Sequence, residues 1–254
     1  MRTANPALIK LVNIDQTQAK SSTMTIRGTV IATSILLAIC AIAAVLMWNA
    51  ISTSANLNLA MTVGLGTMLG GMVVGLIVGF VPKAAPILGP LYAAAQGTFL
   101  ACISYFITVR YLGQADTGVI FQAIIATFSI MAGLLIAFSA GLIRISGTVA
   151  RVMVVLASGL MIYFLVFLGG NLLLGLNIPN LWASTSPLGL AFTAGLVILA
   201  SFFLVLDFQF VQAGVQNKAP RYMEWYAGVG LLATLVWLYV EILRLILKVR
   251  SVME

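Results

Sequence analysis

The sequence contains no histidine, and only 7% of its 254 residues are charged. A soluble domain carries roughly a quarter charged residues, so this chain cannot cover a globular surface in water. The absence of histidine removes the commonest general base and the commonest ligand of transition metals. Composition therefore excludes a soluble globular domain and the usual catalytic and metal-binding patterns built on histidine.

Cysteine is scarce as well. The two cysteines, Cys40 and Cys102, both lie in apolar runs, which predicts buried free thiols rather than a disulfide framework or a zinc site. The chain also lacks a Gly-x-Ser-x-Gly elbow and a phosphate-binding loop, the signatures of common hydrolases and nucleotide enzymes. We therefore expect no enzymatic activity and no organic cofactor.

Long apolar runs are what the chain has in abundance, with 62% hydrophobic residues. Hydrocarbon about 30 Å thick needs ~20 apolar residues per helix, and only helices or closed barrels satisfy their backbone groups in lipid. The runs show no alternation of polar and apolar residues, so they predict helices. The expected fold is an all-α polytopic membrane protein with a bundle of seven transmembrane helices. The predicted spans are residues 29–51, 60–81, 88–109, 118–140, 152–173, 188–210 and 224–247.

The chain divides into three parts. Residues 1–28 form a basic N-terminal tail, residues 29–248 form the membrane domain, and residues 249–254 form a short C-terminal tail. Short joints with Pro and Gly separate the spans, and none is long enough for a soluble domain.

Orientation follows the distribution of Lys and Arg, which gather on the cytoplasmic side. Four of the 13 lie on the far side, namely Arg110, Arg244, Lys248 and Arg250. The other nine lie on the N-terminal side, namely Arg2, Lys10, Lys20, Arg27, Lys83, Arg144, Arg151, Lys218 and Arg221. The N-terminus is therefore predicted to be cytoplasmic and the C-terminus outside. The basic C-terminal end opposes this, and a re-entrant last segment or a six-span count would remove the conflict.

Four segments resemble one family of membrane proteins, in the right order and spacing. They are Met24 to Val30, Gly89 to Gly97, Leu206 to Tyr226, and the last apolar segment from Ala219 to Leu247. They look like the Bax inhibitor (YccA-like) family of the transmembrane Bax-inhibitor-motif superfamily, nearest its bacterial branch. The resemblance implies seven helices with the last helix central, and a location in the bacterial plasma (inner) membrane. Some relatives act as pH-sensitive calcium leaks, and one bacterial branch interacts with a membrane protease.

Several acids of the family pattern are absent. Gln96 stands where close relatives carry Glu, Gln209 where they carry a second Asp, and Gln212 where they carry Glu. Thr234 stands where leak-type relatives carry Asp, and residues 60–81 lack the Arg of the second span. Glutamine keeps the hydrogen bonding of a carboxylate but not its charge. The resemblance therefore predicts weaker calcium binding than in relatives that keep the acids.

Asp207 is the one residue that matches the family's aspartate pair. It lies 19 residues past the start of the sixth span, or roughly 28 Å along a helix, which predicts a position near the cytoplasmic mouth. An ionisable group inside a span is a functional candidate by default, so Asp207 is the candidate gate and the candidate calcium ligand. The alternatives are a carboxylate reaching the interface, or one paired with Arg144, Arg151 or Arg221.

Two further acids lie in the last span. Glu224 is either a substitute partner for Asp207 or a favourable acid at a helix N-terminus. Glu241 and Arg244 are three residues apart on one helix face, which predicts a structural ion pair. Glu241 and Asp207 are expected to lie about a membrane thickness apart and to form no dyad.

Five glycines in the second span, Gly66, Gly70, Gly71, Gly75 and Gly79, recur at helical spacing. Such a stripe lets another backbone approach closely. It predicts packing within the bundle, with a dimer face or a moving helix as the alternative.

Two functions remain open at this point. One is a regulatory protein that interacts with a membrane protease or another membrane complex. The other is a calcium or proton leak channel gated at Asp207, although the chain offers few of the carboxylates that calcium prefers.

Overall fold

The structure is a computed structural model that describes residues 23–54, 56–173, 175 and 180–253. Within these residues the secondary structure is helical, apart from an isolated bridge between Thr23 and Pro220. The helices are α2 (Ile26–Ser54), α3 (Leu57–Phe80), η1 (Pro82–Ala84), α4 (Ala85–Leu112), α5 (Thr117–Ser139), α6 (Gly147–Leu173), α7 (Pro187–Gln216) and α8 (Met223–Met253).

Seven of these helices are long and apolar enough to cross a membrane. The predicted all-α, seven-helix membrane fold is therefore confirmed. Most helices extend beyond the predicted spans because an apolar run marks the lipid-embedded part, whereas a helix continues into its polar ends. In particular, residues 249–253 belong to α8 rather than to a C-terminal tail. Of the predicted N-terminal tail, residues 1–22 lie outside the described residues.

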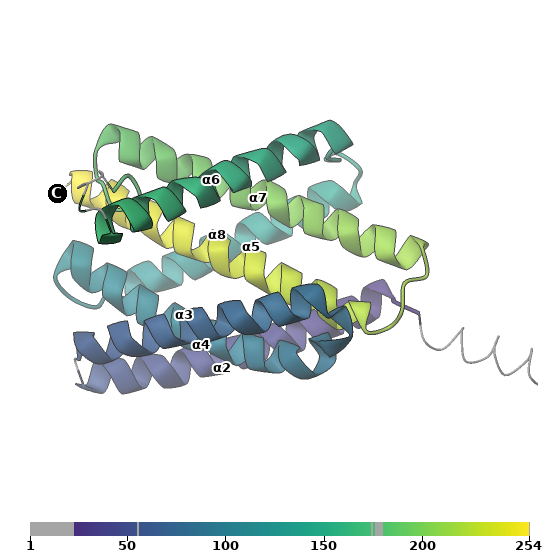
Figure 1. The fold of residues 1–254 in the computed structure, drawn as a ribbon, viewed down its shortest axis with the longest axis horizontal. Coiled ribbons are helices and arrows are strands. Elements are labelled where there is room, and N and C mark those ends of the chain that lie inside the picture. The colour runs from purple at the N-terminus through teal and green to yellow at the C-terminus, as the bar shows by residue number, and fades with distance from the viewer. Residues whose placement is uncertain (1–22, 55, 174, 176–179, 254) are drawn as a thin grey trace, which may run out of the picture.

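Helix α8 occupies the centre of the bundle, as Figure 1 shows. It packs against α2, α4, α5 and α7. Two thirds (67%) of its most apolar window is buried, against 39% or less for every other span in the described residues.

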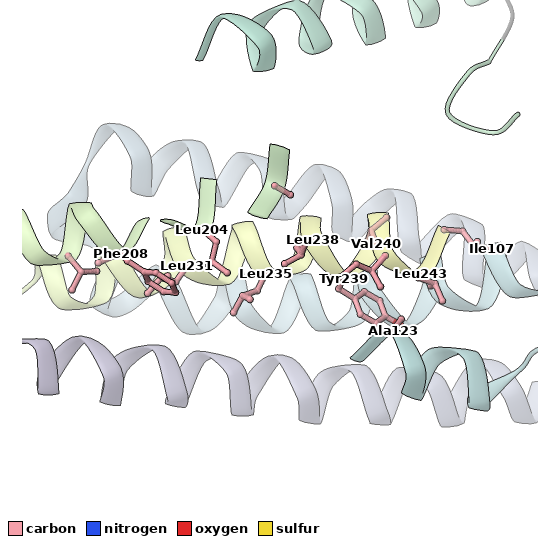
Figure 2. Packing of buried hydrophobic residues seen from close by; sticks show 14 of the residues in the cluster. Ile107, Ala123, Leu204, Phe208, Leu231, Leu235, Leu238, Tyr239, Val240 and Leu243 are labelled. Atoms are coloured by element: carbon pink, nitrogen blue, oxygen red, sulfur yellow. The ribbon is translucent and has the colours of Figure 1, made fainter. Parts of the chain in front are cut away.

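Two clusters of buried residues contain side chains of α8. In one, Leu235, Leu238 and Leu243 pack with Leu204 of α7 and Ile107 of α4, as the close view in Figure 2 shows. In the other, Leu232 and Val236 of α8 lie with Leu36 of α2 and Ala93 of α4. The site residues described below are therefore carried by helices that α8 holds in place.

The two ends of α8 reach opposite ends of the bundle (Figure 1). At its start, the backbone N–H of Met24 donates to Ala219 O at 2.7 Å, which holds the start of α2 beside the α7–α8 connection. Near its end, Arg250 pairs with Asp116, which precedes α5, at 3.0 Å. Because α8 is one continuous helix, the re-entrant alternative for the last segment is wrong.

The glycines of α3 do not form one groove. A Cβ added at Gly71 would lie 3.4 Å from Nε2 of Gln96, and one at Gly75 would lie 3.2 Å from the Tyr92 ring, so these two glycines face α4. Gly66, Gly70 and Gly79 have nothing within 4 Å of such a Cβ. Successive residues of a helix point about 100° apart, so Gly70 and Gly71 belong to different faces. Only part of the predicted stripe packs within the bundle.

Candidate functional site

Asp207 lies deeper in the membrane domain than the sequence predicts. Helix α7 continues through Gln216, nine residues or ~14 Å beyond Asp207. The carboxylate is half-buried and accepts a 2.6 Å hydrogen bond at Oδ2 from the hydroxyl of Thr234 on α8. Because the helix extends past the end of the apolar run, Asp207 lies farther from the helix end than the predicted span implies. Its position at the cytoplasmic mouth stays a prediction.

A cavity of about 870 Å³ opens beside Asp207. Residues of α3, α4, α7 and α8 line it, and Asp207 is the only charged side chain among them. Gln96 contributes an amide to the same lining. The aromatic side chains of the lining are Tyr92, Phe99, Phe203, Phe210 and Tyr226. The site is thus one carboxylate in a large, mostly apolar hollow.

None of the cationic partners that we considered for Asp207 contacts it. The ion pairs in the described part of the chain do not include Asp207. Arg221 instead lies with its Nε 3.8 Å from Oε2 of Glu224. The described residues also contain no group of three or more acidic, Cys or His side chains that could hold a metal ion. One carboxylate, one hydroxyl and one amide do not make the six to eight oxygen ligands that calcium takes.

The three glutamines that replace family acids lie in three different environments. Gln96 lines the cavity with Asp207. The Nε2 of Gln209 donates to the backbone carbonyl of Ile145 at 3.2 Å, so it holds the α5–α6 connection. Gln212 is exposed. Of these positions, only Gln96 could restore a second carboxylate to the cavity.

Glu224 is fixed at the start of the bundle and does not pair with Asp207. Its Oε1 accepts 2.9 Å hydrogen bonds from both the backbone N–H and the hydroxyl of Thr25. Thr25 precedes α2, and its hydroxyl accepts the N–H of Gly28 at 2.9 Å. In a capping box, a Glu three residues after the cap reaches back to the cap N–H. Here that position is Gly28, and Glu224 supplies the carboxylate from another helix.

Glu241 and Arg244 form a buried ion pair with 2.7 Å between Nη1 and Oε2. Trp182, from the connection before α7, covers the pair: its Nε1 donates to Oε1 of Glu241 at 3.4 Å, and the Arg244 guanidinium lies 3.8 Å from its ring centroid. Arg244 also donates to the carbonyl of Trp182. The pair thus joins α8 to the α6–α7 connection.

The pair lies closer to Asp207 than expected. Asp207 faces Thr234, and seven residues of α8 separate Thr234 from Glu241, or ~10 Å along the helix. The expected separation of a membrane thickness is therefore wrong, because the contact with Thr234 brings Asp207 near the middle of α8. The two carboxylates nevertheless have different partners and form no dyad.

Lys248 is buried at the same end of α8. Its ammonium donates to the hydroxyl of Thr193 at 2.8 Å and to the carbonyl of Gly189 at 3.1 Å, both on α7. A buried ammonium needs such acceptors because an unpaired charge in an apolar interior is costly. This lysine therefore does not act as a free basic residue of the C-terminal end, which removes part of the conflict over orientation.

Sequence reasoning missed Thr25, Trp182, Thr193 and Lys248. Thr25 carries a cap signal, but its partner Glu224 is 199 residues away. The sequence predicts that Lys248 lies at the end of the last span, because a lysine ordinarily lies at the interface. Trp182 is a residue type that is common at interfaces, and nothing in the sequence around it indicates that it stacks on Arg244.

The chain was compared with protein families, curated proteins and solved structures over its whole length. No curated protein and no solved structure matches it. Residues 5–251 match the family described as Bax inhibitor 1 like, which is nearly the full length of the sequence. With its seven membrane-spanning helices around a central last helix, the chain belongs to the Bax inhibitor 1 like family.

Proposed function

We propose that this protein is a non-enzymatic regulator that acts by direct contact with another membrane protein, a membrane protease or another membrane complex. The observation that carries the proposal is the low burial of α6 within the bundle. This helix packs mainly along α7, and only 6% of its most apolar window is buried. It contributes little to the bundle, so its sequence is available for contacts outside it.

One face of α6 has the features of a helix–helix contact. Val155 and Ile162 are 68% and 60% exposed, and Gly159 lies between them at helical spacing with no atom within 4 Å of an added Cβ. In lipid, helices associate through van der Waals packing around small residues, because lipid removes the hydrophobic driving force. We define this contact face as Val155, Gly159 and Ile162.

The proposal places the protein in the bacterial plasma membrane with the N-terminus in the cytoplasm. Six cationic side chains are exposed at the N-terminal end of the bundle, namely Arg27, Lys83, Arg144, Arg151, Lys218 and Arg221. At the other end, Arg110 and Arg250 are the only exposed cationic side chains among the described residues, Arg250 pairs with Asp116, and Arg244 and Lys248 are buried. The positive-inside rule then supports a cytoplasmic N-terminal end.

Photo-crosslinking in native membranes tests the contact. A photoreactive amino acid at Val155 or Ile162 should give the same adduct, identified as a membrane protease or a subunit of a membrane complex. The matched control is Leu46 of α2, which is 65% exposed and should give lipid adducts alone. Gly159→Leu should lower the adduct yield, whereas Gly133→Leu on α5, where a Cβ also has open space, should not. Equal adducts from α2 and α6, or lipid adducts alone from α6, would contradict the proposal.

The second candidate function is a calcium or proton leak at Asp207. The cavity that contains this carboxylate within the membrane domain favours it. The small number of oxygen ligands opposes tight calcium binding. Flux into proteoliposomes tests this candidate: a strong calcium or proton flux that Asp207→Asn abolishes would make the leak the main function, and absence of flux would support the regulatory function.

A further inference from the structure

We propose that the cavity beside Asp207 binds a lipophilic organic cation, an ammonium or phosphonium group that carries apolar substituents. This inference goes beyond the proposed regulatory function and rests on a different part of the molecule.

The cavity has a negative charge and no cation of its own. Asp207 is the only charged residue of the lining, and the ion pairs within the described residues leave it out. An ionised group in the membrane ordinarily pairs with an opposite charge. Thr234 donates to Oδ2, which orients the carboxylate but supplies no positive charge. The acceptor capacity of Oδ1 remains for a ligand, since an ionised carboxylate accepts at both oxygens.

The walls are aromatic and apolar. Rings from three helices line the cavity, Tyr92 and Phe99 from α4, Phe203 and Phe210 from α7, and Tyr226 from α8. Ring faces attract organic cations through their quadrupole, and cages of such rings bind quaternary ammonium groups. Met68 and Met72 of α3 add flexible, polarisable side chains that adapt to irregular ligands. Calcium, which requires several oxygen ligands, does not suit these walls.

The size and the opening fit such a ligand. A cavity of about 870 Å³ lies within the range of small-molecule sites, roughly 300–1,000 Å³. Met72 and Leu76 on α3 and Phe210 on α7 line it and have large exposed fractions. We therefore place the entry of a membrane-dissolved ligand between α3 and α7.

Two ions of the same size and shape but opposite charge test the inference. Tetraphenylphosphonium and tetraphenylborate are titrated separately into the purified full-length protein in neutral detergent. We expect saturable binding of the phosphonium at one site, and no saturable binding of the borate. Asp207→Asn should weaken phosphonium binding about tenfold or more. Asp116→Asn, which removes a carboxylate outside the cavity, should leave the binding unchanged.

A second pair of variants separates binding from folding. Tyr226→Leu removes a ring that pairs with Phe210 at 5.9 Å between centroids and should weaken phosphonium binding several-fold. Tyr226→Phe keeps the ring and should retain phosphonium binding. The thermal unfolding of each variant is measured in the same detergent, and affinities are compared among variants that melt cooperatively.

Three results would overturn the inference. The first is equal binding of the two ions, which would indicate an apolar site such as one for lipid chains. The second is full affinity for the phosphonium in Asp207→Asn. The third is displacement of the phosphonium by millimolar calcium. None of these results bears on the contact face of α6, so the two proposals fail separately.

Discussion

The hydroxyl of Thr234 donates a 2.6 Å hydrogen bond to the carboxylate of Asp207, joining α8 to α7 within the membrane domain. The same hydroxyl also lies 3.2 Å from the carbonyl of Gly230, one turn earlier in α8. The family resemblance implies that Thr234 takes the place of an acid of leak-type relatives. The group beside Asp207 in this chain is a hydrogen-bond donor.

Removing this donor should destabilise the fold. Thr234→Val keeps the shape but leaves the carboxylate without its hydroxyl, at an expected cost of about 1.5–3 kcal/mol for a bond to a charged group. Thr234→Ser should restore most of the loss. The measurement is the free energy of unfolding in detergent. In an Asp207→Asn background the cost should be smaller, and an unchanged cost would show that the two residues are not coupled.

Gln96→Glu should strengthen calcium binding and calcium flux in proteoliposomes. Of the glutamines that replace family acids, this one shares the cavity with Asp207, so a carboxylate here adds charge and oxygen ligands. Gln212→Glu is the matched control because Gln212 is exposed, and it should have no effect. Gln209→Asp should lose the bond to Ile145 and lower stability without raising flux. Equal flux from the variants at positions 96 and 212 would contradict the role of the cavity.

The buried pair of Glu241 and Arg244 should be costly to break from either side. Glu241→Leu or Arg244→Leu leaves one buried charge, at an expected cost of about 3–5 kcal/mol, whereas the double variant leaves none. Melting temperatures of the three variants measure this. The double variant should be less destabilised than the sum of the single variants. A larger loss than that sum would mean that the two residues stabilise the bundle independently.

Asp116 should make stability depend on acid pH. Its carboxylate caps α5 by accepting the N–H groups of Val119 and Gly118 and pairs with Arg250, and these bonds hold its pKa below the ordinary value of 3.8. Because the lowered pKa favours the ionised form in the folded state, the stabilisation is complete above pH 3.8 and is lost as the pH falls through the folded value.

The comparison variant is Asp116→Asn, which keeps a capping oxygen but loses the ion pair. It should be less stable than the native chain near neutral pH by about 1 kcal/mol or less, since the pair is partly exposed. The difference should shrink at about pH 3. A constant difference from neutral to acid pH would show that the Asp116 charge does not contribute.

Reporter fusions after residues 55 and 147 should report opposite sides of the membrane. An odd number of helices long enough to span the membrane separates these positions, namely α3, α4 and α5. The fusion after residue 147 should be cytoplasmic, in line with the exposed cations at that end. The same side for both fusions would contradict the topology.

The helices could be predicted from the sequence because each apolar run is long enough to span lipid. The central place of α8 followed from the resemblance and is confirmed by its burial. The ends of the helices could not be predicted, because polar residues such as Gln209 and Gln212 stop the apolar pattern of α7 without stopping the helix. As a result, the predicted spans separate Asp207 from Glu241 by more than the structure does.

The sequence indicates the candidate residues and the pair of Glu241 with Arg244, but not the neighbours that hold them from other parts of the chain. Ionisable residues in apolar runs are conspicuous, so Asp207, Glu241 and Arg244 could be identified from the sequence. Thr234 contacts Asp207 from a different helix, and Trp182 contacts Glu241 and Arg244 from the connection before α7. Neither residue type indicates such a contact in the sequence. The glycine stripe was divided between two faces because one residue of helix changes the direction by about 100°.

The bond between Thr25 and Glu224 has a consequence for biosynthesis. The two residues are 199 positions apart, so at 5–20 residues per second the ribosome needs about 10–40 s to make Glu224 after Thr25. During that interval the start of the first membrane helix lacks the carboxylate that completes its cap. A chain interrupted before Glu224 never acquires it. We therefore expect the segment from Thr23 to Gly28 to be more sensitive to protease in chains that end before Glu224 than in the full chain.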